Sequence, residues 1–269
     1  MPLDLDVLPV RGLAPGGLPV PPARMPLRTG GQLRKRWRYV GLWGERYMLC
    51  AARVQVGPGR QRFWALWDGQ ELRGRTSMLP IGVAVDGVAQ APLFDLRWEQ
   101  DGEPLEVTSR HGDAYIWTRK FPLRATGTVD GEQVELRGLL DDSAGYHARD
   151  THWRWCAGVG ETADGTPVAW NFCNGLHDAD TGGSERAVWV GGVLSEPGPT
   201  TVSDGLTHVT GPAGERLDAA THAVRSHRQN LGVIASDYAQ PFATFAGTLP
   251  GGVAVARGWG VLERHAARW

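Results

Sequence analysis

The segment Phe94-Asp95-Leu96-Arg97-Trp98-Glu99 has an apolar side chain at every second position and a charged one between each pair. Successive side chains of a β-strand point to opposite faces, so this pattern predicts a strand with one buried face. Residues 151–159 repeat the period of two, with Trp153, Trp155 and Val159 on one face. The chain lacks a convincing 3.6-residue period over eleven residues, which favours an all-β protein.

Turn signals separate these alternating runs. An Asp-Gly pair between two such runs indicates a tight hairpin, because a type I′ turn has positive φ at both central residues. Turn spacing of about 8–12 residues predicts roughly 14–18 antiparallel strands, too many for one small closed barrel. Two barrels or a large sandwich would accommodate them. The Asp-Gly pairs lie at 68–69, 86–87, 101–102, 130–131, 164–165 and 204–205.

The chain divides into an arm and two strand-rich halves. Residues 1–30 contain seven prolines and four glycines, which favour neither helix nor sheet. We expect an extended arm strapped across the body; the alternative is a disordered leader. The polar, glycine-containing segment 141–149 is the expected seam, with one β-barrel over 31–144 and a second over 145–269.

Composition excludes several function classes. The 28 basic and 29 acidic side chains give a net charge of −1, which argues against a nucleic-acid partner. An apolar run of about 20 residues, as a transmembrane segment requires, is missing from the sequence, and we see no signal-peptide pattern. These features predict a cytoplasmic protein. The 12 tryptophans, against 4 methionines, predict an interior lined with aromatic side chains.

Motifs for cofactors and metals are also missing from the sequence. It contains no dinucleotide or P-loop glycine pattern, no HExxH and no nucleophile elbow. Cys173 and His177 have ligand-like spacing, but a second pair at zinc-finger spacing is missing. We therefore predict neither a metal nor a cofactor.

The first candidate site lies at the seam. Acid, phenol, imidazole and guanidinium groups occur together just before a tryptophan-rich strand, which would place them at a barrel mouth. The alternative is a latch between the halves, with Asp142 paired to Arg149 and His147 bonded to a backbone carbonyl. We assign Asp142 and His147 catalytic roles and expect ligand-binding roles for Tyr146, Arg149, Trp153 and Trp155.

Two further sets complete the candidates. Glu263 and His265 share a face of the C-terminal strand, where the carboxylate would orient the imidazole and both would be catalytic. The alternative is a face turned to solvent. Amide, acid and phenol groups on other presumed strands are candidate ligand-binding residues, because polar groups inside a barrel need partners. These are Asn171, Glu185, Tyr238 and Gln240.

The order of several motifs resembles the bacterial family DUF2804, a domain of unknown function. The resemblance covers most of residues 28–269 and is carried by seven blocks, at 28–31, 37–43, 145–155, 169–171, 184–186, 238–242 and 260–265. That family is remotely similar to tandem lipocalin-like proteins, which include carotenoid 1,2-hydratases and cofactor-free cyclases. The resemblance implies two packed, antiparallel lipocalin-like β-barrels that bind an apolar ligand.

Three functional hypotheses follow. The first is a cofactor-independent acid–base enzyme of hydratase, dehydratase, isomerase or cyclase type, acting on a hydrophobic small molecule in a Trp-lined cavity. The second is a non-catalytic carrier for such a molecule, and the third is a structural module. A cavity holding a carboxyl and an imidazole within about 3.5 Å favours the enzyme. An apolar cavity without titratable groups favours the carrier, and the absence of a cavity favours the module.

Overall fold

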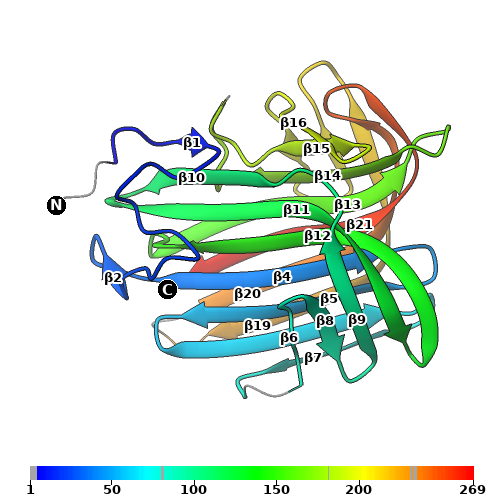
Figure 1. Ribbon diagram of the computed structural model, residues 1–269, viewed down its shortest axis with the longest axis horizontal. Helices are drawn as coiled ribbons and strands as arrows, with labels where there is room; N and C mark the ends of the chain where they lie inside the picture. The colour runs from blue at the N-terminus through cyan, green and yellow to red at the C-terminus, as the bar shows by residue number, and fades with distance from the viewer. Residues whose placement is uncertain (1–4, 80–81, 181, 231, 233–234) are drawn as a thin grey trace.

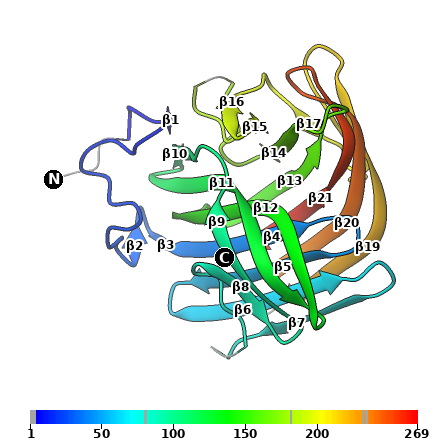
Figure 2. The same cartoon turned by 45° about the vertical axis from the view of Figure 1, so that its right-hand side comes forward.

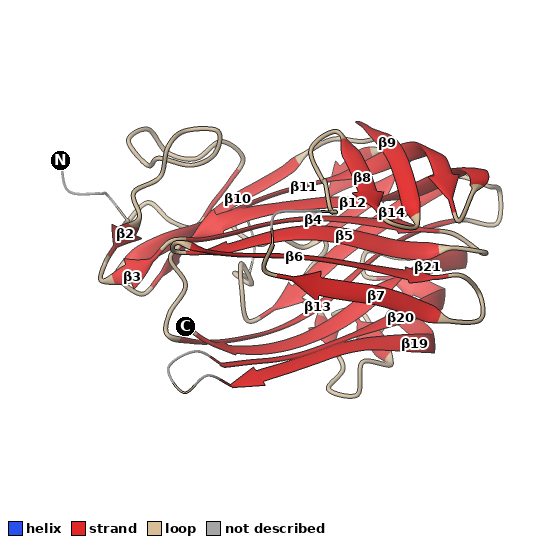
Figure 3. Ribbon diagram, turned by 90° about the horizontal axis from the view of Figure 1, so that it is seen from below, coloured by secondary structure: helices blue, strands red, loops and turns tan. Residues whose placement is uncertain are grey.

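The protein is built from β-strands. The computed structural model describes residues 5–79, 82–180, 182–230, 232 and 235–269, and throughout these ranges its regular structure is strand, without helix (Figure 3). The all-β fold class is therefore confirmed. The described residues form 21 strands, more than the predicted 14–18, because several loops contain strands of two to four residues.

The first sheet has ten antiparallel strands. Its main path runs β1-β10-β11-β12-β4-β5-β6-β7, and the hairpin β8–β9 joins it by pairing β9 with β11 (Figure 1). The strands are β1 (Val10–Arg11), β4 (Lys35–Trp43), β5 (Met48–Val56), β6 (Gly59–Trp67), β7 (Leu72–Ser77), β8 (Val88–Ala91), β9 (Phe94–Gln100), β10 (Leu105–His111), β11 (Ala114–Val129) and β12 (Glu132–Gly145).

The second sheet has nine antiparallel strands, in the order β16-β15-β14-β13-β21-β20-β19-β18-β17. The strands are β13 (Asp150–Glu161), β14 (Pro167–Asn174), β15 (Ala187–Val190), β16 (Val193–Ser195), β17 (Thr201–Val202), β18 (His208–Thr210), β19 (Arg216–Asn230), β20 (Ala235–Leu249) and β21 (Val253–Arg268). A separate two-stranded ribbon pairs β2 (Arg28–Thr29) with β3 (Gln32–Leu33).

Local sequence accounts for the tightest hairpins. β11 and β12 are joined by Asp130 and Gly131, whose φ values of 53° and 84° are those of a type I′ turn. Register shifts interrupt the β19–β20 and β20–β21 ladders. Such bulges bend strands, and β19, β20 and β21 curve strongly along their length (Figure 2).

The core has three apolar layers, because both faces of each sheet are covered. The outer face of the first sheet packs under the β8–β9 hairpin, and that of the second packs under the loops around β17 and β18. Between the sheets, residues such as Tyr39 and Cys50 of the first sheet share a cluster with Trp155, Phe242 and Val261 of the second. Figure 3 shows β4, β5 and β6 in one layer and β19 and β20 in the other.

The N-terminal arm packs along the body, as the strapped-arm hypothesis predicts, and does not form a disordered leader over its described residues. Val10 and Arg11 pair with β10, and the Arg11 guanidinium donates to the carbonyls of Ser184 and Arg186. Leu18 and Met25 enter a small apolar cluster at the start of β11. Residues 1–4 lie outside the described residues.

The two sheets draw on separate parts of the chain. All strands of the first lie within residues 10–145, and all strands of the second lie within 150–268. The division into two domains at residues 144 and 145 stays a prediction.

Candidate functional site

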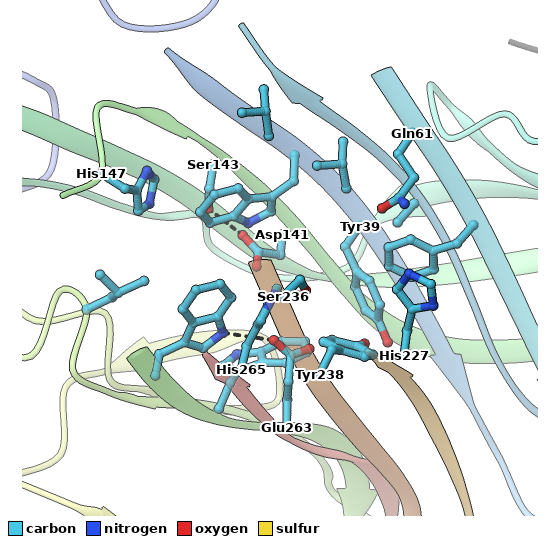
Figure 4. A pocket seen from close by; sticks show the side chains of 18 of the residues that line it. Tyr39, Gln61, Asp141, Ser143, His147, His227, Ser236, Tyr238, Glu263 and His265 are labelled. Carbon is cyan, nitrogen blue, oxygen red and sulfur yellow. Dashed lines mark hydrogen bonds between the residues drawn. The ribbon is translucent and has the colours of Figure 1, made fainter. Parts of the chain in front are cut away.

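A cavity of about 310 Å³ lies between the two sheets (Figure 4). Its wall is contributed by β4, β5, β6, β11 and β12 of the first sheet and by β13, β14, β19, β20 and β21 of the second. The sequence predicted a site at the mouth of a single barrel. The difference arises because the inner face of each sheet packs against the other sheet, so the space left between them is shared.

Aromatic side chains from both sheets line this cavity. Trp37 and Trp153 stack with ring centroids 6.2 Å apart and planes inclined by 9°. Tyr39 meets Trp155 edge to face at 5.5 Å. These contacts form an apolar wall that favours the burial of a flat or extended hydrophobic molecule. The aromatic lining residues are Trp37, Tyr39, Phe63, Trp117, Trp153, Trp155, Tyr238 and Trp269.

Glu263 is a buried acid in this wall. The Trp153 indole N–H donates to its Oε1 at 2.8 Å, and the Gln240 amide donates to its Oε2 at 3.1 Å. Burial raises the pKa of Glu263 to about 7, although the hydrogen bond from Trp153 opposes the shift. Its two hydrogen-bond donors are neutral, so the carboxyl can gain or lose a proton near neutral pH.

His265 lies on the same face of β21, but it is held by a different partner. Its Nε2 is 2.8 Å from the Ser236 hydroxyl, and its ring packs 4.3 Å from that of Trp153. Burial lowers the pKa of His265 to about 4, so the ring is neutral at pH 7. Glu263 therefore does not orient His265 through a hydrogen bond, which corrects the expectation from their spacing.

A buried charged cluster occupies another part of the wall. Lys120 Nζ lies 3.1 Å from Asp141 Oδ2 and 3.1 Å from Glu185 Oε1. The Ser143 hydroxyl donates to Asp141 at 2.7 Å and lies 2.7 Å from the Thr118 hydroxyl. Burial acts to lower the pKa of Lys120, but the two carboxylates outweigh it and raise the pKa, so the lysine remains charged.

Two further histidines, His147 and His177, are buried in the cavity wall. Burial lowers the pKa of His147 well below its usual range, helped by the nearby Lys35 ammonium, and its Nδ1 is a buried atom without a partner among the described residues. His177 Nδ1 lies 2.8 Å from the Ser109 hydroxyl, and burial lowers the pKa of this ring to about 3. Both imidazoles are neutral at pH 7 and act as hydrogen-bonding groups there.

The structure gathers more than half of the residues that the sequence singled out. Seven line the cavity: His147, Trp153, Trp155, Glu185, Tyr238, Glu263 and His265. Trp153 and Trp155 reach it together because residues two apart on β13 share a face. Glu263 is buried and His265 is half-buried, and both line the cavity, so the alternative of a solvent-facing C-terminal strand is wrong for them.

Asp142 is a correction. It points to the opposite face of β12 from Asp141, because neighbouring strand residues alternate. Its Oδ2 accepts from the Arg38 guanidinium, with the Nε donor at 3.1 Å, and pairs with Arg36 at 3.5 Å. Asp141 lines the cavity in its place. The predicted latch between Asp142 and Arg149 is also wrong, because Asp142 pairs with Arg38 of β4, in the same sheet, and not with Arg149 of the other half.

Tyr146 and Arg149 also lie away from the cavity. Tyr146 is buried against the arm, and its hydroxyl donates to the Pro26 carbonyl at 2.8 Å. Arg149 is exposed, and its backbone carbonyl accepts from the Trp269 N–H at 2.8 Å. Of the three seam residues expected to line or rim the cavity, His147 alone does so.

Asn171 and Gln240 support the wall from behind and do not line it. Asn171 accepts from the Trp155 indole at 2.6 Å and donates to the Glu185 carbonyl at 2.7 Å. Gln240 is fully buried and donates to Glu263. They hold in place the side chains that reach the cavity, so the ligand-binding role predicted for them becomes a positioning role.

Sequence reasoning missed Lys120, Asp141 and Arg225, which all line the cavity. One signal was available for Lys120. The chain has 28 basic residues, of which only Lys35 and Lys120 are lysine, so Lys120 was distinguishable by its residue type alone. For Arg225, one of many arginines, the sequence held no comparable signal.

Neither a cluster of metal ligands nor a membrane-spanning helix is found among the described residues. Within those ranges, no three His, Cys, Asp or Glu side chains are grouped so as to hold a metal ion. The same residues form no helix of the length and apolarity needed to cross a membrane.

Comparisons with known proteins support the family resemblance. The family described as "Domain of unknown function (DUF2804)" matches residues 93–203, which confirms the resemblance over that range. A comparison with curated proteins finds no match.

Solved structures with a similar arrangement share little sequence with this chain. Kievitone hydratase from Nectria haematococca is 10% identical, with a TM-score of 0.47, over 85% of this chain and 88% of that one. CghA with Sch210972 is 11% identical, with a TM-score of 0.39, over 97% of each chain. A protein assigned as AttH from Nitrosomonas europaea is 11% identical, with a TM-score of 0.38, over 94% and 98%.

Proposed function

We propose that the protein is a cofactor-independent acid–base enzyme acting on a hydrophobic small molecule held between the two sheets. The observation that carries this proposal is Glu263, a buried carboxyl in an aromatic wall whose pKa burial raises to about 7. A general acid works best when its pKa lies near the working pH. No carboxyl is hydrogen-bonded to an imidazole among the described residues, so the expected acid–imidazole pair does not support the proposal. The titratable groups in the wall argue against a purely apolar carrier cavity, and the cavity itself argues against a structural module.

The proposed chemistry uses one proton that returns to its donor. Glu263 donates its proton to an unsaturated carbon or an oxygen of the substrate, and the aromatic rings of the cavity wall stabilise the positive charge that develops. Water, a group of the substrate itself or loss of a neighbouring proton then resolves the cation. The Glu263 carboxylate accepts the released proton, so hydration, isomerisation and cyclisation all regenerate the acid.

The other polar groups would orient the substrate. The imidazole of His265, neutral at pH 7, offers a hydrogen bond beside Glu263. The buried hydroxyls of Tyr39 and Tyr238 lie beside Cys50 and Glu263, but neither has a hydrogen-bond partner in good geometry among the described residues. An unpartnered buried hydroxyl is costly unless a ligand or water satisfies it. These two hydroxyls are therefore the groups we expect a polar substrate atom to contact.

Ligand capture tests the proposal while the substrate is still unidentified. Wild type and Glu263→Gln are purified from the same native lysate, and the retained small molecules are identified by mass spectrometry. We expect the variant to hold a precursor that differs from the wild-type ligand by one water or is its isomer. Added wild type should convert the captured precursor, and added variant should not.

The carrier hypothesis gives a different result. Both proteins would then hold the same molecule, and wild type would return it unchanged. Asp142→Asn serves as the matched control, since this acid lies close in sequence to the cavity residue Asp141 but faces away from the cavity. Loss of conversion in this control equal to that in Glu263→Gln would remove the assignment of Glu263.

A further inference from the structure

Two guanidinium groups line the cavity, those of the exposed Arg60 and the half-buried Arg225, and neither forms an ion pair with a carboxylate of the described residues. Arg225 extends from β19 into the cavity wall, and its one side-chain acceptor there is the Thr76 hydroxyl, 2.9 Å from Nη2. A guanidinium carries five N–H donors in a planar fork. Most of the donors of Arg225 therefore have no protein partner in the described part of the chain.

The neighbouring acids are already engaged. Both oxygens of Glu263 accept from neutral side chains, Trp153 and Gln240. Asp141 and Glu185 each lie 3.1 Å from Lys120. Within the described ranges Lys120 has two anionic partners. Arg225 forms no ion pair and meets Glu263 only as a nearby charge, so the N–H edge of this half-buried guanidinium remains for a ligand.

Aromatic rings hold this guanidinium in place. Its Cζ lies 4.0 Å from the ring centroid of Phe63 and 5.0 Å from that of Tyr238. Stacking on rings covers the faces of a guanidinium and leaves its N–H edge open, which is the edge that binds a carboxylate through two parallel hydrogen bonds. The same rings would contact the apolar body of a ligand whose carboxylate meets that edge.

We infer that the cavity takes a hydrophobic molecule bearing a carboxylate, and that Arg225 binds this carboxylate. The inference rests on the proposed function for the identity of the cavity as the site and adds the substrate class. The arginine anchors one end of the ligand, and the aromatic wall holds its body. A charge-assisted, partly desolvated pair of this kind gives both affinity and orientation.

The test compares 2-naphthoate with its neutral isostere 2-naphthamide, by calorimetric titration of the full chain at about pH 7.5. We expect wild type to bind the acid at least about tenfold more tightly than the amide. Arg225→Gln should abolish that preference by weakening naphthoate binding, with naphthamide binding unchanged. Arg225→Lys, which keeps the charge but lacks the planar fork, should retain part of it.

Two further variants make the result specific. Arg228→Gln removes an exposed arginine of the same strand that pairs with Asp237, and it should leave the preference intact. Glu263→Gln should also retain the preference, so binding of the anion and loss of catalysis are read separately. Thermal melts confirm that each variant is folded. Equal wild-type affinity for both probes, no binding of naphthoate, or an unchanged preference in Arg225→Gln would overturn the inference.

Discussion

Glu263 and Glu185 are buried carboxyls of the same cavity, but the protein surrounds them differently. Glu185 lies 3.1 Å from the Lys120 ammonium, which Asp141 also contacts. Glu263 is bound by the neutral donors of Trp153 and Gln240. Burial raises the pKa of both acids. At Glu185 the Lys120 ammonium is the main group that opposes the shift, whereas at Glu263 it is the neutral Trp153 donor, with a smaller contribution from the charge of Arg225.

This difference separates a structural role from a chemical one. In a charged cluster the mutual attraction of the groups keeps them ionised. Losing one member therefore leaves the other charges unpaired in the interior. A carboxyl among neutral donors and aromatic rings is free to change its protonation near pH 7 without breaking an ion pair. We therefore expect substitutions in the Lys120 cluster to affect folding, and substitutions at Glu263 to affect turnover.

The largest effect on stability should come from Lys120→Met. This variant leaves Asp141 and Glu185 buried without their cation, which should lower the free energy of unfolding by about 3–5 kcal/mol. Chemical denaturation at pH 7 measures it. The triple variant Lys120→Met, Asp141→Asn, Glu185→Gln should recover much of that loss, because it removes the unpaired charges together. A single variant as stable as wild type would contradict the comparison.

The second largest effect should be a dependence of stability on pH that is caused by Glu263. Its pKa in the folded protein, about 7, is above its usual value of 4.5, so the folded state binds the extra proton. Protonation of Glu263 should therefore contribute about 3 kcal/mol of stability at low pH that is lost as pH rises from 4.5 to 7. Glu263→Gln lacks this contribution, so its stability relative to wild type should rise by about that amount over the same range.

The same measurement separates Glu263 from His265. The pKa of His265 is lowered to about 4, so its contribution to stability is lost as pH falls below about 6.5. The slope of stability with pH that His265 contributes is opposite in sign to that of Glu263, and it is present in both wild type and Glu263→Gln. Subtracting the Glu263→Gln profile from that of wild type removes it, and a flat difference between pH 4.5 and 8 would disprove the raised pKa.

Trp153→Phe should have a smaller effect, a change in the pKa of Glu263. The indole N–H donates to Glu263 and favours its charged form, so its removal should raise the pKa of Glu263 by roughly one further unit. Infrared titration of the protonated carboxyl band measures the shift directly. Any falling limb of turnover with pH should move upward with it, and a downward shift would show that the indole does not stabilise the carboxylate.

Asp142→Asn should have the smallest effect. This acid pairs with Arg38 on the face of β12 that points away from the cavity, and Arg38 keeps a second partner in Asp86. We expect the free energy of unfolding to fall by about 1 kcal/mol and turnover of the captured precursor to stay at the wild-type rate. A strong loss of turnover would show that the cavity extends to this face.

Strand character and much of the site were predictable because both depend on local pattern. Period-two alternation identified β9 and β13, and the same rule placed Trp153 beside Trp155. The Asp-Gly signal at 130–131 marked a true two-residue hairpin. At the seam, alternation places Asp141 and Asp142 on opposite faces of the strand but does not say which face lines the cavity. From the sequence we predicted Asp142, whereas the structure places Asp141 there.

The sequence by itself determined that the chain forms antiparallel sheets, and that Glu263 and His265 share one face of a strand. Only the tertiary structure decided that this face meets the other sheet, that Trp153 and Gln240 bind Glu263, and that Arg225 lies in the same cavity. The physical reason is distance along the chain. Alternation is set between neighbouring residues, whereas burial and pairing depend on strands far apart along the chain, such as β13 and β21, and on the packing of one sheet against the other.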